Sequence, residues 1–170
     1  MKLVNETRRK KMLESVKLYF EACNSASREF FAQILAEDCI HYFPPETGGP
    51  YYGRDAIANL WIGFVRDKDS RWTIDREVCD GNEICIEWTH WKPGVGEHIR
   101  GSEWYEFGED GKINAIWAHY ASPRDTARAA NELEGFKYEK HGYPLQAPQL
   151  SRETHERRTA SLHAEEQRDG

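Results

Sequence analysis

Hydrophobic positions in the first part of the chain recur at helical spacing. Over residues 7–24, apolar side chains return every three or four residues, the period of an amphipathic helix packed on a core. A second helix is predicted after Ser27, a residue type that caps helix N-termini, with apolar positions that continue to Leu35. A third is predicted after Asp55, another candidate cap, with apolar positions through Phe64. Three helices that each bury one face are therefore expected.

Strand-like patterns dominate the centre of the chain. Runs rich in β-branched and aromatic residues occupy 71–79, 83–91, 98–107 and 112–120. The turn residues Asp80–Asn82 and Gly108–Gly111 separate these runs into two antiparallel hairpins. A shorter strand is expected at 39–43, followed by a turn-rich loop that ends near Gly53. Helices early and strands late predict an α+β fold with helices on one face of the sheet.

The composition changes after the last predicted strand. A short helix is expected over 124–134, and two prolines favour an extended segment over 142–149. The last twenty residues contain one Leu and many charges, so their apolar burial cannot offset the entropy of ordering. We therefore expect one domain over 1–122. Residues 123–170 are expected to be an extension that is partly extended or disordered, or an arm that lies on a partner subunit.

Composition narrows the classes of partner. The chain has 170 residues and a net charge of −6, which argues against nucleic acid because phosphate binding depends on a basic surface. No apolar run approaches the ~20 residues of a membrane span, and no apolar secretion signal follows the N-terminus. Four cysteines without CxxC spacing are interpreted as reduced thiols of a cytoplasmic protein. We expect no nucleic acid and no membrane partner.

The run GSEWYEF raises a specific question about a carboxyl group. In a strand, Glu103 shares one face with Tyr105 and Phe107. If that face is the core, the carboxyl is buried between aromatic rings, which costs several kcal/mol unless the group is partnered or neutral. Such an expensive placement makes Glu103 a candidate functional residue.

The element order and the landmarks GRDAI (53–57) and DGKI (110–113) resemble the NTF2-like superfamily, which includes SnoaL-like polyketide cyclases and ketosteroid isomerases. The resemblance covers about residues 7–122. It implies an α+β cone in which a curved antiparallel sheet wraps around the N-terminal helices and encloses a deep apolar pocket. Many relatives dimerise through the outer sheet face. Here that face would carry Trp91, Trp104 and Trp117, so a homodimer or higher homo-oligomer is expected.

The same resemblance suggests catalytic positions. VKLYFEACN is similar to the isomerase helix that carries an oxyanion-hole Tyr, which implies that role for Tyr19. SEWYEF is similar to the strand that carries a protonated Asp, the second donor, and Glu103 falls there. The isomerase's general base falls at Phe43, which cannot accept a proton. Steroid isomerisation by that route is therefore not expected.

Two histidines are candidates for the missing base. Strand alternation places His41 and His90 on the pocket side, and imidazole titrates near neutral pH. Glu103 on the adjacent strand is a possible partner of His90. Whether Glu103 is then an ionised partner or a neutral donor stays open. A one-residue shift of register would bring His119 inside instead.

The aromatic content indicates the kind of ligand. Six Trp, eight Tyr and seven Phe are many for this length, and a pocket for a flat apolar molecule is expected. The predicted substrate-binding residues are Phe43, Trp61, Trp88, Tyr105 and Tyr120. No HxH, HExxH or GxGxxG motif occurs, so neither a metal nor a cofactor is expected.

These observations predict a cofactor-independent lyase or isomerase that uses general acid–base catalysis. The expected substrate is hydrophobic and hydroxylated, aromatic or polycyclic. Dehydration or carbon–carbon cleavage of lignin-derived diaryl compounds fits, as does a polyketide-like or steroid-like substrate. Epoxide hydrolysis, which needs an Asp–Arg–Asp arrangement, ranks lower. The alternative is a non-catalytic ligand-binding or dimerisation module.

Overall fold

A computed structural model describes most of the chain. The described residues are 6–45, 47–80, 83–122, 125, 127–133 and 135–168. The helices are α1 (Glu6–Ser25), α2 (Arg28–Ile34), α3 (Arg54–Lys68) and α4 (Arg152–Arg168), with 3₁₀ turns η1 (Pro93–Val95) and η2 (Tyr138–His141). The strands are β1 (Leu35–Tyr42), β2 (Tyr51–Tyr52), β3 (Arg71–Asp80), β4 (Glu83–Lys92), β5 (Glu97–Phe107), β6 (Ile113–Tyr120) and β7 (Ala130–Asn131).

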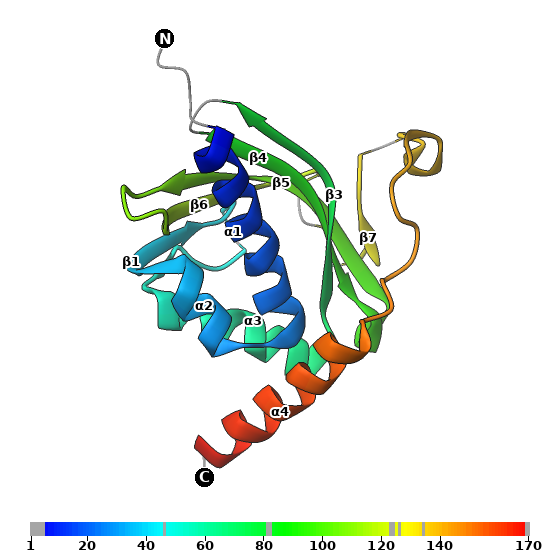
Figure 1. Cartoon of the computed structure of the whole chain (residues 1–170). Helices are drawn as coiled ribbons and strands as arrows, with labels where there is room; N and C mark the ends of the chain where they lie inside the picture. Colours follow the sequence, from blue (N-terminus) through cyan, green and yellow to red (C-terminus); the bar gives the residue numbers. More distant parts are fainter. Residues whose placement is uncertain are drawn as a thin grey trace.

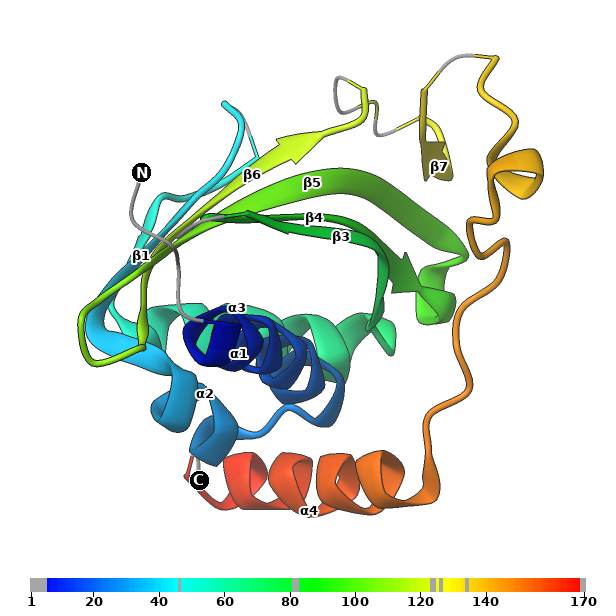
Figure 2. The same ribbon diagram turned by 45° about the horizontal axis from the view of Figure 1, so that its top comes forward.

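One curved sheet forms the body of the molecule. Its strand order is β2-β1-β6-β5-β4-β3, and β7 pairs with the part of β5 that β6 does not reach. The helices α1, α2 and α3 lie against its concave side, as Figures 1 and 2 show. This confirms the expected α+β cone. The expectation of a purely antiparallel sheet is wrong, because β1 pairs with β6, and β7 with β5, in parallel.

Local signals placed most of the helices and strands. Ser27 caps α2 as predicted, since its Oγ accepts a hydrogen bond from the amide of Phe30 at 3.4 Å. Leu35 starts β1 rather than ending α2. Asp55 does not cap α3: the cap residue is Gly53, and Asp55 lies in the first turn. A carboxylate there still interacts favourably with the helix dipole.

Both predicted hairpins are present. Asp80 pairs with Glu83 at the end of the β3–β4 ladder, and residues 81 and 82 of the predicted turn lie outside the described part. The β5–β6 ladder runs from Gly101–Tyr120 to Phe107–Ile113. Alternation along these strands fixes the side chains that face the helices, which is what positions the site.

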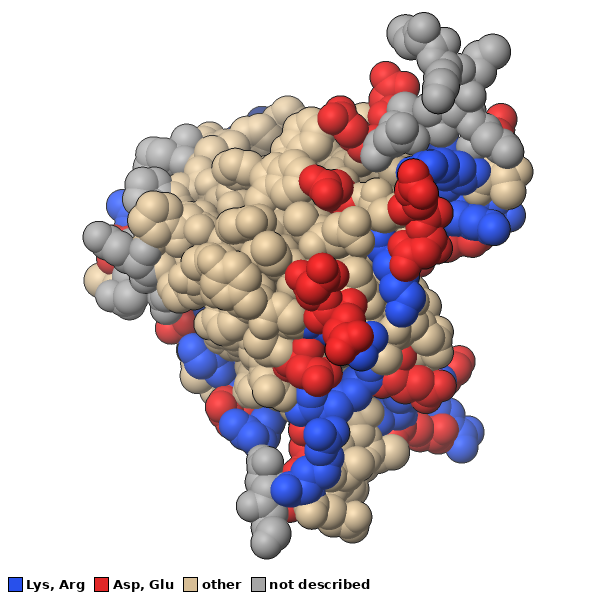
Figure 3. Space-filling view, turned by 90° about the vertical axis from the view of Figure 1, so that its left-hand side faces the viewer, with Lys and Arg blue, Asp and Glu red and all other residues tan. Residues whose placement is uncertain are grey.

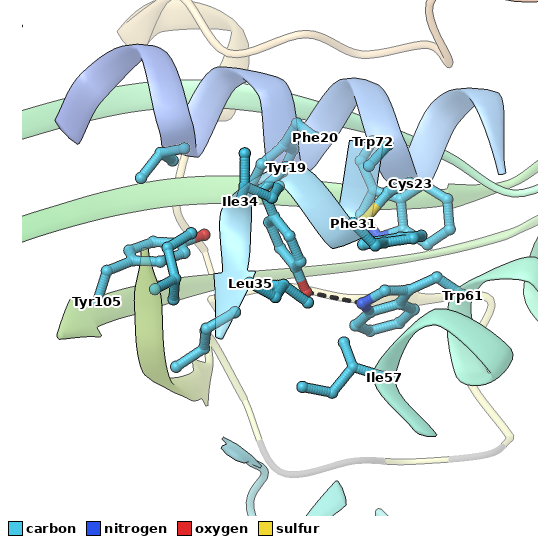
Figure 4. Packing of buried hydrophobic residues seen from close by; sticks show 14 of the residues in the cluster. Tyr19, Phe20, Cys23, Phe31, Ile34, Leu35, Ile57, Trp61, Trp72 and Tyr105 are labelled. Carbon is cyan, nitrogen blue, oxygen red and sulfur yellow. Dashed lines mark hydrogen bonds between the residues drawn. The ribbon is translucent and has the colours of Figure 1, made fainter. Parts of the chain in front are cut away.

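The core fills the space between the helices and the sheet. Figure 4 shows its centre, where Tyr19 of α1 meets Phe31 of α2, Trp61 of α3 and Tyr105 of β5. Tyr19 makes edge-on contacts with Phe31 and Tyr105, with ring centroids about 6 Å apart. Three helices and the sheet therefore share one aromatic cluster.

The first part of the extension, which carries β7 and η2, lies on the convex side of the sheet, whereas α4 lies on the helix side (Figure 2). The helix predicted over 124–134 is wrong for the described residues, which form a turn and the short strand β7. Arg100, buried beneath this segment, explains the difference: its Nε donates to Glu132 at 2.6 Å and its Nη2 to the carbonyl of Pro144 at 2.7 Å. The guanidinium also stacks 4.2 Å from the Tyr138 ring. One buried cation thus fixes the extension to the sheet.

The expected disorder at the C-terminus is also wrong, because residues 152–168 form α4, which packs against α1. Ordering comes from specific polar contacts rather than apolar area. Arg158 is 6% exposed, donates to Asp69 at 2.9 Å and donates to the carbonyl of Ser70. Farther along, Glu165 accepts two hydrogen bonds of 2.6 Å from Arg28. Contact of this segment with a partner subunit stays a prediction.

Replacing Arg158 should loosen α4. We expect Arg158→Ala to lower the free energy of unfolding by about 1–3 kcal/mol, because it leaves the Ser70 carbonyl without its donor. Arg152→Ala is the matched control on the same helix: its side chain is 91% exposed in an i,i+4 pair, so the loss should stay below about 0.5 kcal/mol. Chemical denaturation measures both, and equal losses would contradict the anchoring role.

Candidate active site

A cavity of about 230 Å³ lies between α3 and the concave face of the sheet. Aromatic rings form most of its wall, and its polar side chains are few. It is lined by Phe43, Thr47, Tyr51, Leu60, Trp61, Phe64, Trp72, Trp88, His90, Lys92, Ile99, Glu103 and Tyr120. Such a wall suits an apolar ligand that a few polar groups orient.

Glu103 contributes a carboxyl group to the cavity wall and is 5% exposed. The Tyr105 hydroxyl donates to Oε2 at 2.6 Å, and Nε2 of His41 lies 3.5 Å from Oε1. The second contact is an ion-pair distance rather than a hydrogen bond, and among the described residues Nε2 has no hydrogen-bond partner. The buried carboxyl therefore has one firm donor and one polar neighbour.

A line of buried polar groups continues behind Glu103. Nδ1 of His41 lies 3.3 Å from the Tyr19 hydroxyl, which accepts a hydrogen bond of 2.7 Å from Nε1 of Trp61. Figure 4 shows the Tyr19–Trp61 contact as a dashed line. The Tyr19 hydroxyl can accept from Trp61 and donate to Nδ1 when the imidazole proton sits on Nε2, facing Glu103. Four elements of the fold thus hold one carboxyl.

Strand register explains why these residues meet. Ile116 of β6 is opposite His41 on β1 and opposite Tyr105 on β5, so all three face the helices in one row. Glu103 lies two residues along β5 from Tyr105, on the same face. Because the β1–β6 pair is parallel, the sequence alone could not align His41 with Glu103.

Both tyrosines of this line keep their protons. Burial, above all, raises the pKa of Tyr19 and of Tyr105 well above the usual value, and the nearby Glu103 carboxyl raises both further. Each hydroxyl therefore acts as a donor at neutral pH. Tyr105 is a fixed donor to Glu103, and Tyr19 is a fixed donor to His41.

His90 lies in a different part of the cavity from Glu103. Its register partner on β5 is Ile99, whereas Glu103 is opposite Ile86, four residues away. At about 3.4 Å per residue this is roughly 14 Å. The predicted His90–Glu103 pair is therefore wrong: Nε2 of His90 lies 2.9 Å from Oγ of Ser70, and the neighbour of Glu103 is His41.

The environment of His90 disfavours its charged form. The imidazole stacks on Trp72 with centroids 4.3 Å apart and is buried. Burial, followed by the ammonium groups of Lys92 and Lys68, lowers the pKa of His90 well below its usual 6.5. The ring is therefore neutral at pH 7.

The other predicted positions divide between the cavity and its surroundings. Phe43, Trp61, Trp88 and Tyr120 line the cavity, whereas Tyr105 contacts Glu103 from behind. Tyr19 and His41, predicted to act on the substrate, are buried behind the wall and do not line it.

Two further residues considered for the sheet, His119 and Trp91, lie on its convex face. His119 is exposed on the convex face, so the one-residue shift of register that would bring it inside does not occur. Trp91 faces outward as predicted but is buried, since Nε1 donates to Thr73 and Arg100 covers its ring.

Sequence reasoning missed Lys92. Its side chain is 3% exposed and lines the cavity, together with Tyr51, Thr47, Leu60 and Ile99. The signal was available, because the inward set on β4 that contains Trp88 and His90 continues by alternation to Lys92.

The described residues contain neither a cluster of metal-ligating side chains nor a helix that could span a membrane. No group of three or more His, Cys, Asp or Glu side chains there is placed to hold a metal ion. Within the same described part, no helix has the length and apolar character needed to cross a membrane.

A family model for the SnoaL-like domain matches residues 16–116, more than half of the chain. The chain belongs to the SnoaL-like family. A structure of a protein of unknown function with a cystatin-like fold, from Methylobium petroleophilum PM1, shares 35% identity with a TM-score of 0.66 and covers 84% of this chain and 97% of its own. No curated protein matches the sequence. The resemblance to NTF2-like and SnoaL-like proteins is thereby confirmed.

More distant SnoaL-like structures share the fold. A candidate ketosteroid isomerase from Kribbella flavida is 17% identical with a TM-score of 0.58, and covers 84% of this chain and 93% of its own. A candidate polyketide cyclase from Sinorhizobium meliloti is 15% identical with a TM-score of 0.54, and covers 62% and 94%. At these identities the likeness concerns the fold.

The pKa of His90 makes stability depend on pH. Because its folded-state pKa lies below the unfolded value near 6.5, the unfolded chain binds the extra proton first, and acid below pH 6.5 destabilises the fold. This loss is at most about 1.4 kcal/mol per pH unit. We expect His90→Gln to flatten the fall in unfolding free energy between pH 7 and pH 5.

Urea denaturation at several pH values measures this slope. The exposed His119→Gln variant is the control and should keep the wild-type slope. A wild-type slope in His90→Gln would show that His90 carries none of the acid sensitivity.

Proposed function

We propose that this SnoaL-like protein catalyses proton transfer on a hydrophobic small molecule without a cofactor, as an isomerase, cyclase or lyase. One observation carries the proposal: the carboxyl of Glu103 lies in the wall of an aromatic cavity, with Tyr105 on one oxygen and His41 beside the other. A carboxyl in an apolar site is poised for general acid–base catalysis.

Glu103 is the group that would touch the reacting atoms. As a base it takes a proton from a substrate carbon or hydroxyl, and as the resulting acid it returns that proton. Return to another carbon gives an isomer, whereas transfer to a leaving hydroxyl gives water and an unsaturated product. Tyr105 holds the carboxyl in place, and its high pKa prevents it from losing its own proton.

Tyr19, His41 and Trp61 are positioning residues in this scheme. This changes the expected roles of Tyr19 and His41, because neither lines the cavity. The His41 imidazole contacts Glu103 on the side that faces away from the substrate, and the Tyr19 phenol contacts that imidazole in turn. His90 lines the cavity, but its neutral ring contacts Ser70 and lies four residues along the strands from Glu103.

The cavity wall supports an aromatic or polycyclic substrate. Trp61, Trp72, Trp88 and Phe64 offer flat faces and edges to a planar ligand. The buried Nε1 of Trp88 has no hydrogen-bond partner among the described residues. Because an unpaired buried donor costs about 1–3 kcal/mol, a substrate oxygen that reaches it is favoured. Hydroxylated diaryl, polyketide-like and steroid-like compounds meet these demands.

The role of Glu103 can be tested before the natural substrate is known. The probe is 5-nitrobenzisoxazole, whose ring opens when a base removes its carbon-bound proton and releases a coloured phenolate. We expect Glu103→Gln to lower kcat/KM about 10²–10⁴-fold, the usual contribution of a positioned base. Glu106→Gln is the matched control: it lies on the same strand but is exposed on the other face, and its activity should equal wild type.

Absorbance of the product measures both variants, and thermal unfolding confirms that both are folded. Wild-type turnover no faster than that of Glu103→Gln contradicts the catalytic role. That outcome favours the alternative, a SnoaL-like module that binds a ligand without transforming it.

The proposed homodimer rests on an apolar row across the convex face. Tyr42, Trp117, Trp104, Cys85 and Val78 are successive register partners on five adjacent strands. Tyr42, Trp104 and Val78 are exposed. Figure 3 shows a broad area of this side of the molecule, left of its centre, that carries few Lys, Arg, Asp or Glu side chains. A contiguous apolar surface of this kind is typical of subunit contacts.

A charge in this row should break the dimer. We expect Trp104→Glu to convert a wild-type dimer into a monomer, because a carboxylate would be buried in an apolar contact. Val95→Glu, at an exposed apolar position in η1 outside the row, should leave the dimer intact. Light scattering after gel filtration gives the masses, and a monomeric wild-type protein would exclude this contact.

A further inference from the structure

We propose that the end of the cavity formed by His90 and Lys92 binds a carboxylate, so that the ligand of this protein is an elongated apolar acid. The inference rests on the proposed function only for what happens at the opposite end, where Glu103 lies. It rests on its own observations for the position, burial and charge of the lysine.

Lys92 is built into the wall. Its side chain lines the cavity beside His90 and is 3% exposed, although Lys is among the residues that proteins bury least often. The ammonium lies 5.7 Å from the centre of the Phe64 ring and 3.8 Å from a carboxylate oxygen of Glu97. Glu97 is half-exposed at the start of β5, so its carboxylate offsets the lysine charge from the solvent side.

A second cation strengthens the positive field at this end. The ammonium of Lys68, in the last turn of α3, lies 5.1 Å from the centre of the same Phe64 ring. Both lysines lower the pKa of His90, which shows that their fields reach the cavity wall. The contacts described for this end thus include two ammonium groups, of Lys92 and Lys68, and one carboxylate, of Glu97. A ligand carboxylate would face more positive than negative charge here.

The cavity separates this end from Glu103. Along the paired strands β4 and β5, Lys92 is opposite Glu97 and Ile86 is opposite Glu103, six residues apart. At about 3.4 Å per residue, the backbone positions lie roughly 20 Å apart before the curvature of the sheet is considered. The wall between them is formed by Trp88, Trp72 and Ile99. A ligand held by its acid group at Lys92 presents its far end to Glu103.

The binding partner is thus defined by its chemistry. It has a carboxylate at one end, an apolar and preferably aromatic body, and the reacting carbon or hydroxyl toward the other end. A lysine in a desolvated site forms a stronger hydrogen bond with a carboxylate than with a neutral amide. Such a site therefore discriminates an acid from its amide.

A matched pair of ligands tests this. The probes are 4-phenylbutanoate and 4-phenylbutanamide, which differ in charge but hardly in shape. We expect wild-type protein to bind the acid at least about tenfold more tightly than the amide at pH 7.5 and low salt, where screening is weak. Calorimetry measures both affinities. Quenching of tryptophan fluorescence provides a second readout, since Trp61, Trp72 and Trp88 line the cavity.

Three variants assign the preference. Lys92→Gln should reduce it to within about twofold, and Lys92→Arg, which keeps the charge, should restore it. Lys10→Gln removes an exposed lysine of α1 and should leave it unchanged. Equal binding of the two probes by wild type, undetectable binding of the acid at millimolar concentration, or a full preference in Lys92→Gln each overturns the proposal.

The same titration in Glu103→Gln separates this inference from the proposed function. A preference for the acid that persists there supports the carboxylate site whether or not Glu103 is a catalytic residue. A lost preference in that variant would place the discrimination at Glu103 and contradict the assignment to Lys92.

Discussion

The burial of one carboxyl group organises the concave side of this protein. Glu103 can occupy an aromatic wall because Tyr105 donates to it and His41 lies beside it. Those neighbours depend in turn on the parallel pairing of β1 with β6 and on the contact of Tyr19 with Trp61. An uncompensated carboxyl there would cost several kcal/mol. Helices α1 and α3 and three strands therefore all contribute to the position of a single side chain.

Charged groups are distributed differently on the two faces of the sheet. On the concave face, polar groups are few and lie at the two ends of an aromatic cavity. On the convex face, Arg100 is buried among Asp75, Thr89 and Glu132, and the extension closes over it. Arg100 in turn covers Trp91, whereas Trp104 in the apolar row stays exposed. One end of the outer sheet face is occupied within the chain, and the other remains available to a second copy.

The sequence predicted what depends on local pattern. Alternation placed Glu103, His90 and Trp88 on the inner face, and the cap at Ser27 and both hairpins followed from short signals. It could not predict which inner residues meet, because that depends on register between strands far apart in the chain. Hence alternation offers His90 as a possible partner of Glu103, although the residue beside Glu103 is His41. It also failed for α4, since composition measures apolar area and not the specific contacts of Arg158 and Glu165.

The contacts of Arg158 tie the end of the chain to the interior. Arg158 binds the carbonyl of Ser70, whose hydroxyl contacts His90, and His90 lines the cavity. Two polar contacts therefore connect a helix outside the matched family region with the wall of the cavity. A change in the tail that moves Arg158 would therefore reach the cavity wall without altering any residue of the sheet.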